Sequence, residues 1–430
     1  MGEGFITRRG GVSAEPSPVY GVEWDKTTDD VTRTNDSVGK VYSKNVNGDV
    51  TTVVSDFDNL EPFKNIRRCN LDMDTGEVLA YFGDATYTDT PSVGVEVMVE
   101  LPKFYYRNER RHHGGIKFQI SPVNLNTFNV HPAFVRDGVE KDKIYVSAYE
   151  GAIYDTVAED YITFNDGDAI IGDQQIGTLA DGILRSVKGV MPSAMHTIVE
   201  NRTMCEQNDG TQYDALSHWA LSLLMIIEYA TLNTQTVFNG VVDYATRGSG
   251  QTGNVNNAQN TGHTDVLGNQ SGEVDVPAEN GASGQASQPV FSYRGVENLY
   301  GNIWKWLDGV NISPSGDIGG WYLADHDFVS NKFDEQYSRV GAYPASASPG
   351  SFIDDIVINQ EIDFGFIPAS LTGSSSTAFA DATFTSTATN RVARVGGAWQ
   401  AGASGGAFHL VLFDISGDRD RRIGARLLKF

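Results

Sequence analysis

Alternation of hydrophobic and polar residues runs through the first third of the chain and predicts β-strands. Short segments of this kind span residues 19–24 and 50–55, and runs of Asp, Asn, Thr and Gly separate them. Longer segments, rich in β-branched and aromatic residues, span 93–107 and 142–155. A period of two places alternate side chains on one face of a sheet, so we expect half-buried strands in these four places.

One long segment has helical spacing of its hydrophobic residues. Within residues 214–235 the helical positions are occupied by Trp219, Leu223, Ile226 and Ile227. Asp214 can cap the first turn. Hydrophobic residues cover most sides of this segment, which predicts a helix buried in the core. His218 lies on it, and a lone histidine there is expected to be a satisfied core or surface side chain rather than a metal ligand.

The order of these patterns defines the expected architecture. Residues 1–90 are β-rich and divided by turns, whereas residues 91–430 carry the longer strands and the helix. We therefore expect an α+β fold, with an N-terminal region at 1–90 and a larger domain at 91–430. Residues 247–288 are rich in Gly, Asn, Ser and Gln, which predicts a long surface loop without a core of its own.

Composition restricts the partners of the chain. With 430 residues, of which 40% are hydrophobic and 20% charged, the composition is that of a soluble globular protein. A formal net charge of −23 disfavours binding to nucleic acid or to anionic membranes, and no segment has the length of a membrane span. The first residues lack the apolar stretch of a secretory signal, so we expect a protein made in the cytoplasm. Cys69 and Cys205 are expected to be reduced thiols.

Motifs for catalysis and for metal binding are weak in this sequence. A Gly-Ser-Gly triplet at 248–250 lies in the polar insertion, without the strand that a nucleophile elbow requires. His112 and His113 are adjacent, so their side chains would point apart rather than share a metal. Polar residues alternate between 70 and 74 as in a calcium loop, but a hairpin turn is the better interpretation. The sequence predicts no enzyme and no cofactor, although the negative charge leaves room for structural calcium.

Three short motifs in the second half of the chain occur in a distinctive order. They are Gly-Asn-x-Trp-x-Trp, Gly-Gly-x-Trp and Ile-Gly-x-Arg, formed by Gly301, Asn302, Trp304, Trp306, Gly396, Gly397, Trp399, Ile423, Gly424 and Arg426. This set resembles the C-type-lectin-like fold of formylglycine-generating-enzyme type, in scattered blocks over residues 93–430. The resemblance implies a C-type-lectin-like ligand-binding domain at 91–430. From the residues alone, the glycines allow backbones to approach closely and the tryptophans fill the space between them.

The cysteines set this chain apart from the enzyme family. That enzyme is expected to carry cysteines in its C-terminal portion, and this chain has none after Cys205. Four further segments, at residues 68–84, 97–107, 131–151 and 423–430, carry a second resemblance. Through them the chain is similar to variable proteins of diversity-generating retroelements and to phage tail-tip receptor-binding proteins of the major-tropism-determinant type. This resemblance implies a homotrimeric tail protein in a virion, made in the host cytoplasm, that binds phage tail proteins and a host cell-surface protein or glycan. Residues 1–90 would then serve trimerisation or tail attachment.

The segment before the last motif contains the candidate contact residues. In relatives of this kind, adenine-directed substitution of Asn codons cannot yield Lys, Glu, Gln, Met or Trp, and residues 409–422 contain none of the five. The expected outward-pointing, variable ligand-binding positions are His409, Val411, Phe413, Asp414, Ile415, Asp418, Asp420 and Arg422, with Ala401 and Ser404 as weaker additions. A reverse-transcriptase gene beside an adenine-rich near-copy of this segment would support diversification. Absence of both would leave a static receptor-binding loop.

Three hypotheses of function remain open. The first is the phage receptor-binding protein, without catalysis. The second is a variable lectin-like protein displayed on a bacterial surface, against which the missing secretory signal counts. The third is an enzyme, either an oxidase-like relative or a tail depolymerase that degrades surface glycan. Binding to host glycans without formation of new reducing ends separates the first from the third.

Overall fold

The protein is built mainly of strands. The structure, a computed structural model, describes residues 17–162, 178–239, 258–277, 288–313, 319–330, 336–342, 351–386, 389–399 and 401–430. Within these ranges 31 strands accompany two α-helices, α1 (Ile198–Glu206) and α2 (Ala215–Tyr229). The expected α+β class is therefore wrong, because the fold is β-rich, and the sheets do not confirm a C-type-lectin-like domain. Many strands have only two to four residues. Such short segments show too few alternating positions to be recognised as strands from the sequence.

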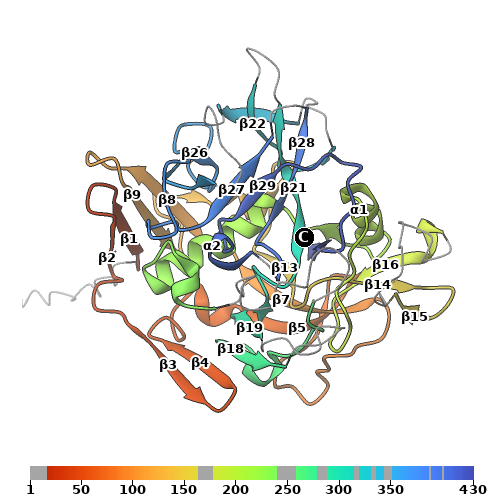
Figure 1. Ribbon diagram of the computed structural model, residues 1–430. Helices are drawn as coiled ribbons and strands as arrows, with labels where there is room; N and C mark the ends of the chain where they lie inside the picture. The colour runs from red at the N-terminus through yellow and green to blue at the C-terminus, as the bar shows by residue number, and fades with distance from the viewer. Residues whose placement is uncertain are drawn as a thin grey trace, which may run out of the picture.

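Two large sheets form the centre of the molecule (Figure 1). The first has the order β17 (Thr211–Gln212), β31 (Leu427–Lys429), β13 (Lys143–Ser147), β7 (Val95–Pro102), β5 (Arg67–Asp72) and β6 (Val78–Tyr81). The second has the order β23 (Ser338–Gly341), β22 (Gly320–Leu323), β21 (Trp304–Ser313), β28 (Arg391–Val395), β29 (Leu410–Leu412), β27 (Ala382–Thr385) and β24 (Ser351–Phe352). It also includes β30 (Ile423–Gly424), which pairs in parallel with the start of β21. The final strand, β31, lies between two earlier strands, so the carboxyl end is held inside a sheet.

Smaller sheets surround these two. One contains β10 (Asn129–Val130), β8 (Tyr105–Arg110), β9 (Ile116–Ser121), β1 (Tyr20–Asp25) and β2 (Asp30–Asn35). Another contains β20 (Val296–Glu297), β19 (Gln288–Tyr293), β18 (Ser271–Val276), β4 (Val50–Ser55) and β3 (Tyr42–Asn47). The remaining strands are β15 (Asp160–Tyr161), β14 (Ala152–Asp155) and β16 (Gly182–Arg185), with the pairs β11 (Val135–Arg136)–β12 (Val139–Glu140) and β25 (Asp355–Ile356)–β26 (Pro368–Ser370).

The four expected strand segments are all found. Two of them correspond to β1 and β4, while the longer two are each divided, into β7 and β8 and into β13 and β14. The expected hairpin turn joins β5 to β6, where the Gly76 amide donates to the Asp72 carbonyl at 2.9 Å. Strands from before residue 90 pair with later ones, as β1 does with β9 and β5 with β7. The role of residues 1–90 in trimerisation or tail attachment stays a prediction.

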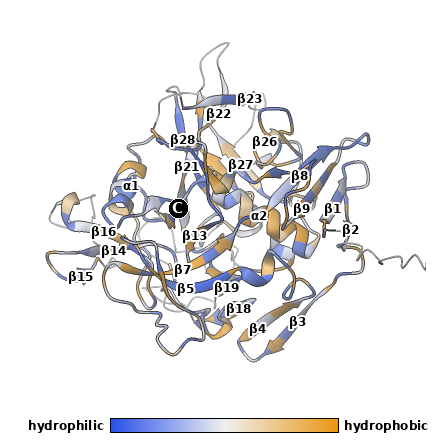
Figure 2. Ribbon diagram, turned by 180° about the vertical axis from the view of Figure 1, so that it is seen from behind, coloured by the Kyte–Doolittle hydropathy of each residue, from blue (hydrophilic) through white to orange (hydrophobic). Residues whose placement is uncertain are grey.

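The helix α2 is the expected core helix, although it ends earlier than the pattern suggests. All fifteen of its residues are buried, and Asp214 caps it by accepting from the Ser217 amide at 2.8 Å. Hydrophobic residues colour much of this helix where it lies in the middle of the molecule (Figure 2). It stops at Tyr229 because Ala230 adopts a left-handed conformation, with φ of 52°. No helix in the described ranges is long and apolar enough to cross a membrane.

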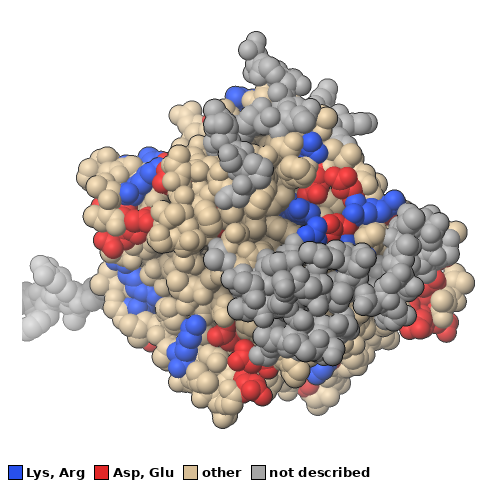
Figure 3. Space-filling view, viewed as in Figure 1, with Lys and Arg blue, Asp and Glu red and all other residues tan. Residues whose placement is uncertain are grey.

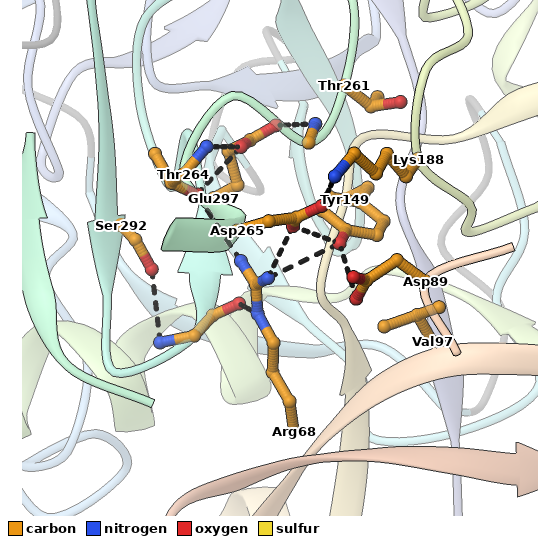
Figure 4. Close-up of polar contacts among 12 residues, drawn as sticks. Arg68, Asp89, Val97, Tyr149, Lys188, Thr261, Thr264, Asp265, Ser292 and Glu297 are labelled. Carbon is orange, nitrogen blue, oxygen red and sulfur yellow. Dashed lines mark hydrogen bonds and ion pairs between the residues drawn. The ribbon is translucent and has the colours of Figure 1, made fainter. Parts of the chain in front are cut away.

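Residues 258–277 are not the surface loop that their composition predicts. Strand β18 lies between β4 and β19 within a sheet. Before it, Asp265 lies 2.7 Å from a guanidinium nitrogen of the fully buried Arg68, and Glu297 accepts from the Thr264 amide at 2.8 Å (Figure 4). This polar segment has a defined structure because residues of distant strands bind it. The composition of the segment does not reveal those partners. The parts of the expected loop at 247–257 and 278–287 lie outside the described residues.

The motifs that carry the family resemblance meet in one buried polar network. Lys305 Nζ lies 2.7 Å from Glu150 Oε1, with side chains 0% and 1% exposed. The side-chain amide of Asn302 donates to the same carboxylate, and the backbone carbonyl of Asn302 accepts from the Trp399 backbone amide at 2.8 Å. We call Glu150, Asn302 and Lys305 the Glu150 network. Charges buried this deeply are retained only with close partners, so the network fixes how these segments meet.

The other motif residues are packed around this network. The Arg426 guanidinium is fully buried and donates to the Ser147 carbonyl at 2.7 Å. Trp306 and Trp399 are 0% and 3% exposed, as the sequence predicts. Gly396 has φ of +96°, and a Cβ there would lie 3.0 Å from the Tyr300 Cα, so only glycine fits without strain.

Replacing Lys305 with methionine tests the weight of the network. The change leaves the Glu150 carboxylate buried without its cation, so Lys305→Met should lower the free energy of unfolding by about 3–5 kcal/mol. Lys64 forms an ion pair with Glu61 in which both side chains are more than 40% exposed, and Lys64→Met serves as the control. The control should change stability by less than about 1 kcal/mol. Urea unfolding measures both, and equal effects would contradict a structural role of the buried pair.

Candidate functional site

A cavity of about 490 Å³ opens at one face of the eight-stranded sheet. Its walls are Trp304, Phe384, Arg394, Ala401, Ser404, His409, Val411, Phe413 and Arg422. Six of these nine belong to the ten contact positions that the sequence predicts: Ala401, Ser404, His409, Val411, Phe413 and Arg422. The structure thus brings most of the predicted positions around one hollow, whose volume lies in the usual range for small-ligand sites, about 300–1,000 Å³.

Strand periodicity explains which side chains reach the cavity. His409, Val411 and Phe413 are separated by two residues along and beside β29, so they share one face of the sheet. Leu410 and Leu412 alternate with them and pack into the main hydrophobic core. One short strand therefore contributes to the core with one set of residues and to the cavity wall with the other.

The neighbouring strands extend this wall. Arg394 on β28 and Phe384 on β27 are both opposite Val411 in the strand register. Trp304, at the start of β21, completes the floor, and its backbone amide donates to the Arg422 carbonyl at 2.6 Å. The cavity is therefore built from four strands that are separated in sequence by up to about a hundred residues.

His409 is a polar side chain of the wall whose two ring nitrogens both lack a hydrogen-bond partner among the described residues. Its ring lies 4.6 Å from the Trp304 ring, edge to face, and 5.7 Å from the Phe384 ring, stacked. The side chain is only 1% exposed. Burial, and to a smaller extent the Arg394 charge, lowers the pKa of His409 to about 3. The neutral ring offers one donor and one acceptor to a molecule in the cavity.

The charged side chains of the wall are paired with carboxylates. Arg394 Nε lies 3.1 Å from Asp414 Oδ2, and the guanidinium is also 4.8 Å from the centre of the Trp304 ring, a cation–π distance. Arg422 Nε donates to Asp420 Oδ1 at 2.7 Å. Burial raises the pKa of Asp414, which Arg394 opposes. Acidic and basic side chains form a mixed patch over the region of β28 and α1 (Figure 3).

The predicted positions differ in exposure more than the sequence suggests. His409 and Val411 are each 1% exposed, and Asp414 is 9% exposed, so the expectation that all ten point outwards is wrong. His409 and Val411 belong to the cavity wall, where the Trp304 and Phe384 rings contact His409 and Arg394 lies opposite Val411. Phe413 is 50% exposed and stands at the mouth.

Four predicted positions do not line the cavity. Asp414 and Asp420 are paired with the arginines that do. The Asp418 carboxylate accepts from the Ile415 amide at 2.8 Å and so shapes the adjoining turn. Ile415 is 39% exposed beside it. A binding role for all ten positions stays a prediction.

Three wall residues were missed by the sequence analysis. Trp304 was expected to be framework only, and it is also the cavity floor. Phe384 belongs to a Ser- and Thr-rich segment that gave no strand signal. Arg394 is a charged residue within the hydrophobic strand β28, which is the one local signal that could have identified it. In the part of the chain that the structure describes, no three His, Cys, Asp or Glu side chains gather as metal ligands would.

Comparison with known proteins adds a distant likeness. No protein-family model and no curated protein matches the chain. Solved structures of the major tropism determinant are similar: the P3c variant at 11% identity over 91% of this chain and 81% of that one, and the M1 variant at 12% over 92% and 84%. The U1 variant is 12% identical over 85% and 72%, and all three have a TM-score of 0.27. A TM-score of 0.27 is too low for this likeness to assign a function.

A comparison of the buried His218 with the buried His409 tests whether His409 has a structural role or is available to a ligand. His218 is satisfied, since its nitrogens contact the Tyr213 hydroxyl at 3.1 Å and the Ala407 carbonyl at 2.6 Å. His218→Leu should therefore lower the free energy of unfolding by about 2 kcal/mol or more, because it leaves buried partners unpaired. His409→Leu removes two unpaired polar atoms and should leave stability unchanged or raise it by about 1 kcal/mol.

Chemical unfolding of both variants measures the difference. A loss of stability in His409→Leu as large as that in His218→Leu would show that His409 has a structural partner and is not reserved for a ligand.

Proposed function

We propose that this protein is a receptor-binding protein of a phage tail that recognises a host-surface protein or glycan in the cavity around His409, without catalysis. The observation that carries the proposal is the unsatisfied His409 ring in a cavity whose wall is formed largely by the segment 401–422. Such a ring, placed between Trp304 and Phe384, supports binding by stacking and by hydrogen bonds together.

The chemistry of the wall favours binding over reaction. A general base for neutral pH needs a pKa near 7, and the pKa of His409 is far below that value. Arg394 and Arg422 each face a carboxylate, which fixes their side chains and leaves their outer N–H groups for directional contacts. A fixed set of donors around aromatic faces is the arrangement of a recognition site.

The sequence resemblance supplies the biological setting of the proposal. It supports a homotrimer in the virion, made in the host cytoplasm, in which several copies raise avidity for the host surface. It also supports diversification of the wall by a retroelement, because Phe413, Arg422 and their neighbours can change while Leu410 and Leu412 keep the core. Phage tail proteins would be the permanent partners and the host ligand the variable one.

Two exposed hydrophobic residues of the same segment test the proposal. Phe413 lines the cavity, whereas Ile415, two residues later, does not. In binding assays with host cells and purified envelope glycan, Phe413→Ala should weaken binding about tenfold or more, and Ile415→Ala by less than about threefold. Both side chains are at least 39% exposed, so the unfolding temperature of each variant should match that of the wild type.

The same assay separates binding from degradation. Bound glycan should show no new reducing ends after prolonged incubation. Equal binding by the two variants would place the contact outside the cavity, and release of reducing ends would show an enzyme.

A further inference from the structure

A second cavity, of about 370 Å³, lies beside the end of the six-stranded sheet and shares no wall residue with the first. Gln212 on β17, Arg202 on α1 and Asp308 on β21 contribute to its wall. Trp304 faces the first cavity and Asp308 the second. Trp306, which lies between them on β21, is fully buried and donates its indole N–H to the His196 carbonyl at 3.0 Å. The two hollows are therefore separate sites.

Gln212 is the unsatisfied group of this second cavity. Its side chain is 0% exposed, and neither the amide nitrogen nor the amide oxygen has a hydrogen-bond partner among the described residues. A primary amide offers donors and an acceptor side by side. Buried amides are almost always bonded, so the cavity is where a bound molecule would supply the missing donor and acceptor.

The two arginines of the wall contribute little free positive charge. Arg202 binds Asp308 through two nitrogens, at 2.6 and 3.1 Å. Arg136 forms an ion pair with Asp214, and its guanidinium lies 3.9 Å from the centre of the Phe430 ring. Each guanidinium is thus committed to a carboxylate, and the arginines cannot serve as an anion site as they stand.

The remaining charges of the wall are mainly negative. Glu206, Asp325 and Asp327 add three carboxylates, and among the described wall residues His326 is the one other cationic group apart from the paired arginines. His326 Nδ1 lies 2.6 Å from Asp325 Oδ1, and this contact raises the pKa of the ring. Even with His326 protonated, the carboxylates outnumber it, so the cavity attracts cations.

We infer that the second cavity binds an amino sugar. Gln212 bonds neighbouring hydroxyl groups of the ring, while Phe328 and Phe430 provide hydrophobic faces for its C–H groups. The carboxylates at Glu206, Asp325 and Asp327 attract the ammonium group. This site is independent of the proposed receptor contact, because it lies on other residues and needs no part of the segment 401–422.

Calorimetric titration with glucosamine at pH 7 tests the inference, with glucose and glucuronate as neutral and anionic comparisons. The wild type should bind glucosamine about tenfold more tightly than glucose and should not bind glucuronate. Gln212→Leu should weaken glucosamine binding about tenfold or more. Its unfolding temperature should not fall, because two unpaired polar atoms are removed. Asp325→Asn combined with Asp327→Asn should remove the preference for glucosamine over glucose.

Phe413→Ala is the matched control, since it alters only the first cavity, and it should bind glucosamine as the wild type does. The inference is overturned if the wild type does not bind glucosamine, if Gln212→Leu binds it equally well, or if glucuronate binds as tightly. Loss of glucosamine binding in Phe413→Ala would assign the sugar to the first cavity instead.

Discussion

The buried ion pair between Glu150 and Lys305 is the constraint on which the rest of the structure depends. Burial lowers the pKa of Lys305 to about 8, and Glu150 opposes that shift, so the Lys305 ammonium is mainly charged at neutral pH. Two opposite charges that are buried away from water must stay paired, because separating them would leave each without a partner. The pair therefore joins the turn after β13 to the start of β21. Trp304 directly precedes Lys305, and its backbone amide donates a hydrogen bond to the carbonyl of Arg422. The pair thereby also sets the floor of the first cavity.

The cavity can vary because its wall and the core use opposite faces of the same strand. Leu410 and Leu412 belong to the core, while His409, Val411 and Phe413 line the hollow. A period of two keeps these sets apart, so exchange of one set leaves the packing of the other in place. The network that holds the strands lies elsewhere, at Glu150. Stability and recognition thus fall largely on different residues, although the buried Val411 also packs in a smaller hydrophobic cluster with Trp304 and Trp306.

The sequence was sufficient for features with a strong local pattern. The helix α2 and the strands β1 and β4 could be predicted. The mixed segment 401–422 stands out between regular motifs, and six of its predicted contact positions line the cavity, but their role in binding stays a prediction. What depended on distant partners could not be predicted. Residues 258–277 have a defined structure because Arg68 and Glu297 bind them, and His409 is buried by strands that only the fold places beside it. Phe384 and Gln212 could not be predicted as cavity residues either, because they lie in segments without a recognisable pattern and only the fold places them beside a cavity.

Native-state hydrogen exchange at the backbone amides of Trp304 and Trp399 tests the central claim most directly. Both amides bond across the segments that the Glu150 network joins, to Arg422 and Asn302. In Glu150→Gln both should lose protection from exchange, whereas in Phe413→Ala both should exchange as in the wild type. Wild-type protection in Glu150→Gln, or lost protection in Phe413→Ala, would contradict a framework that is independent of the cavity wall.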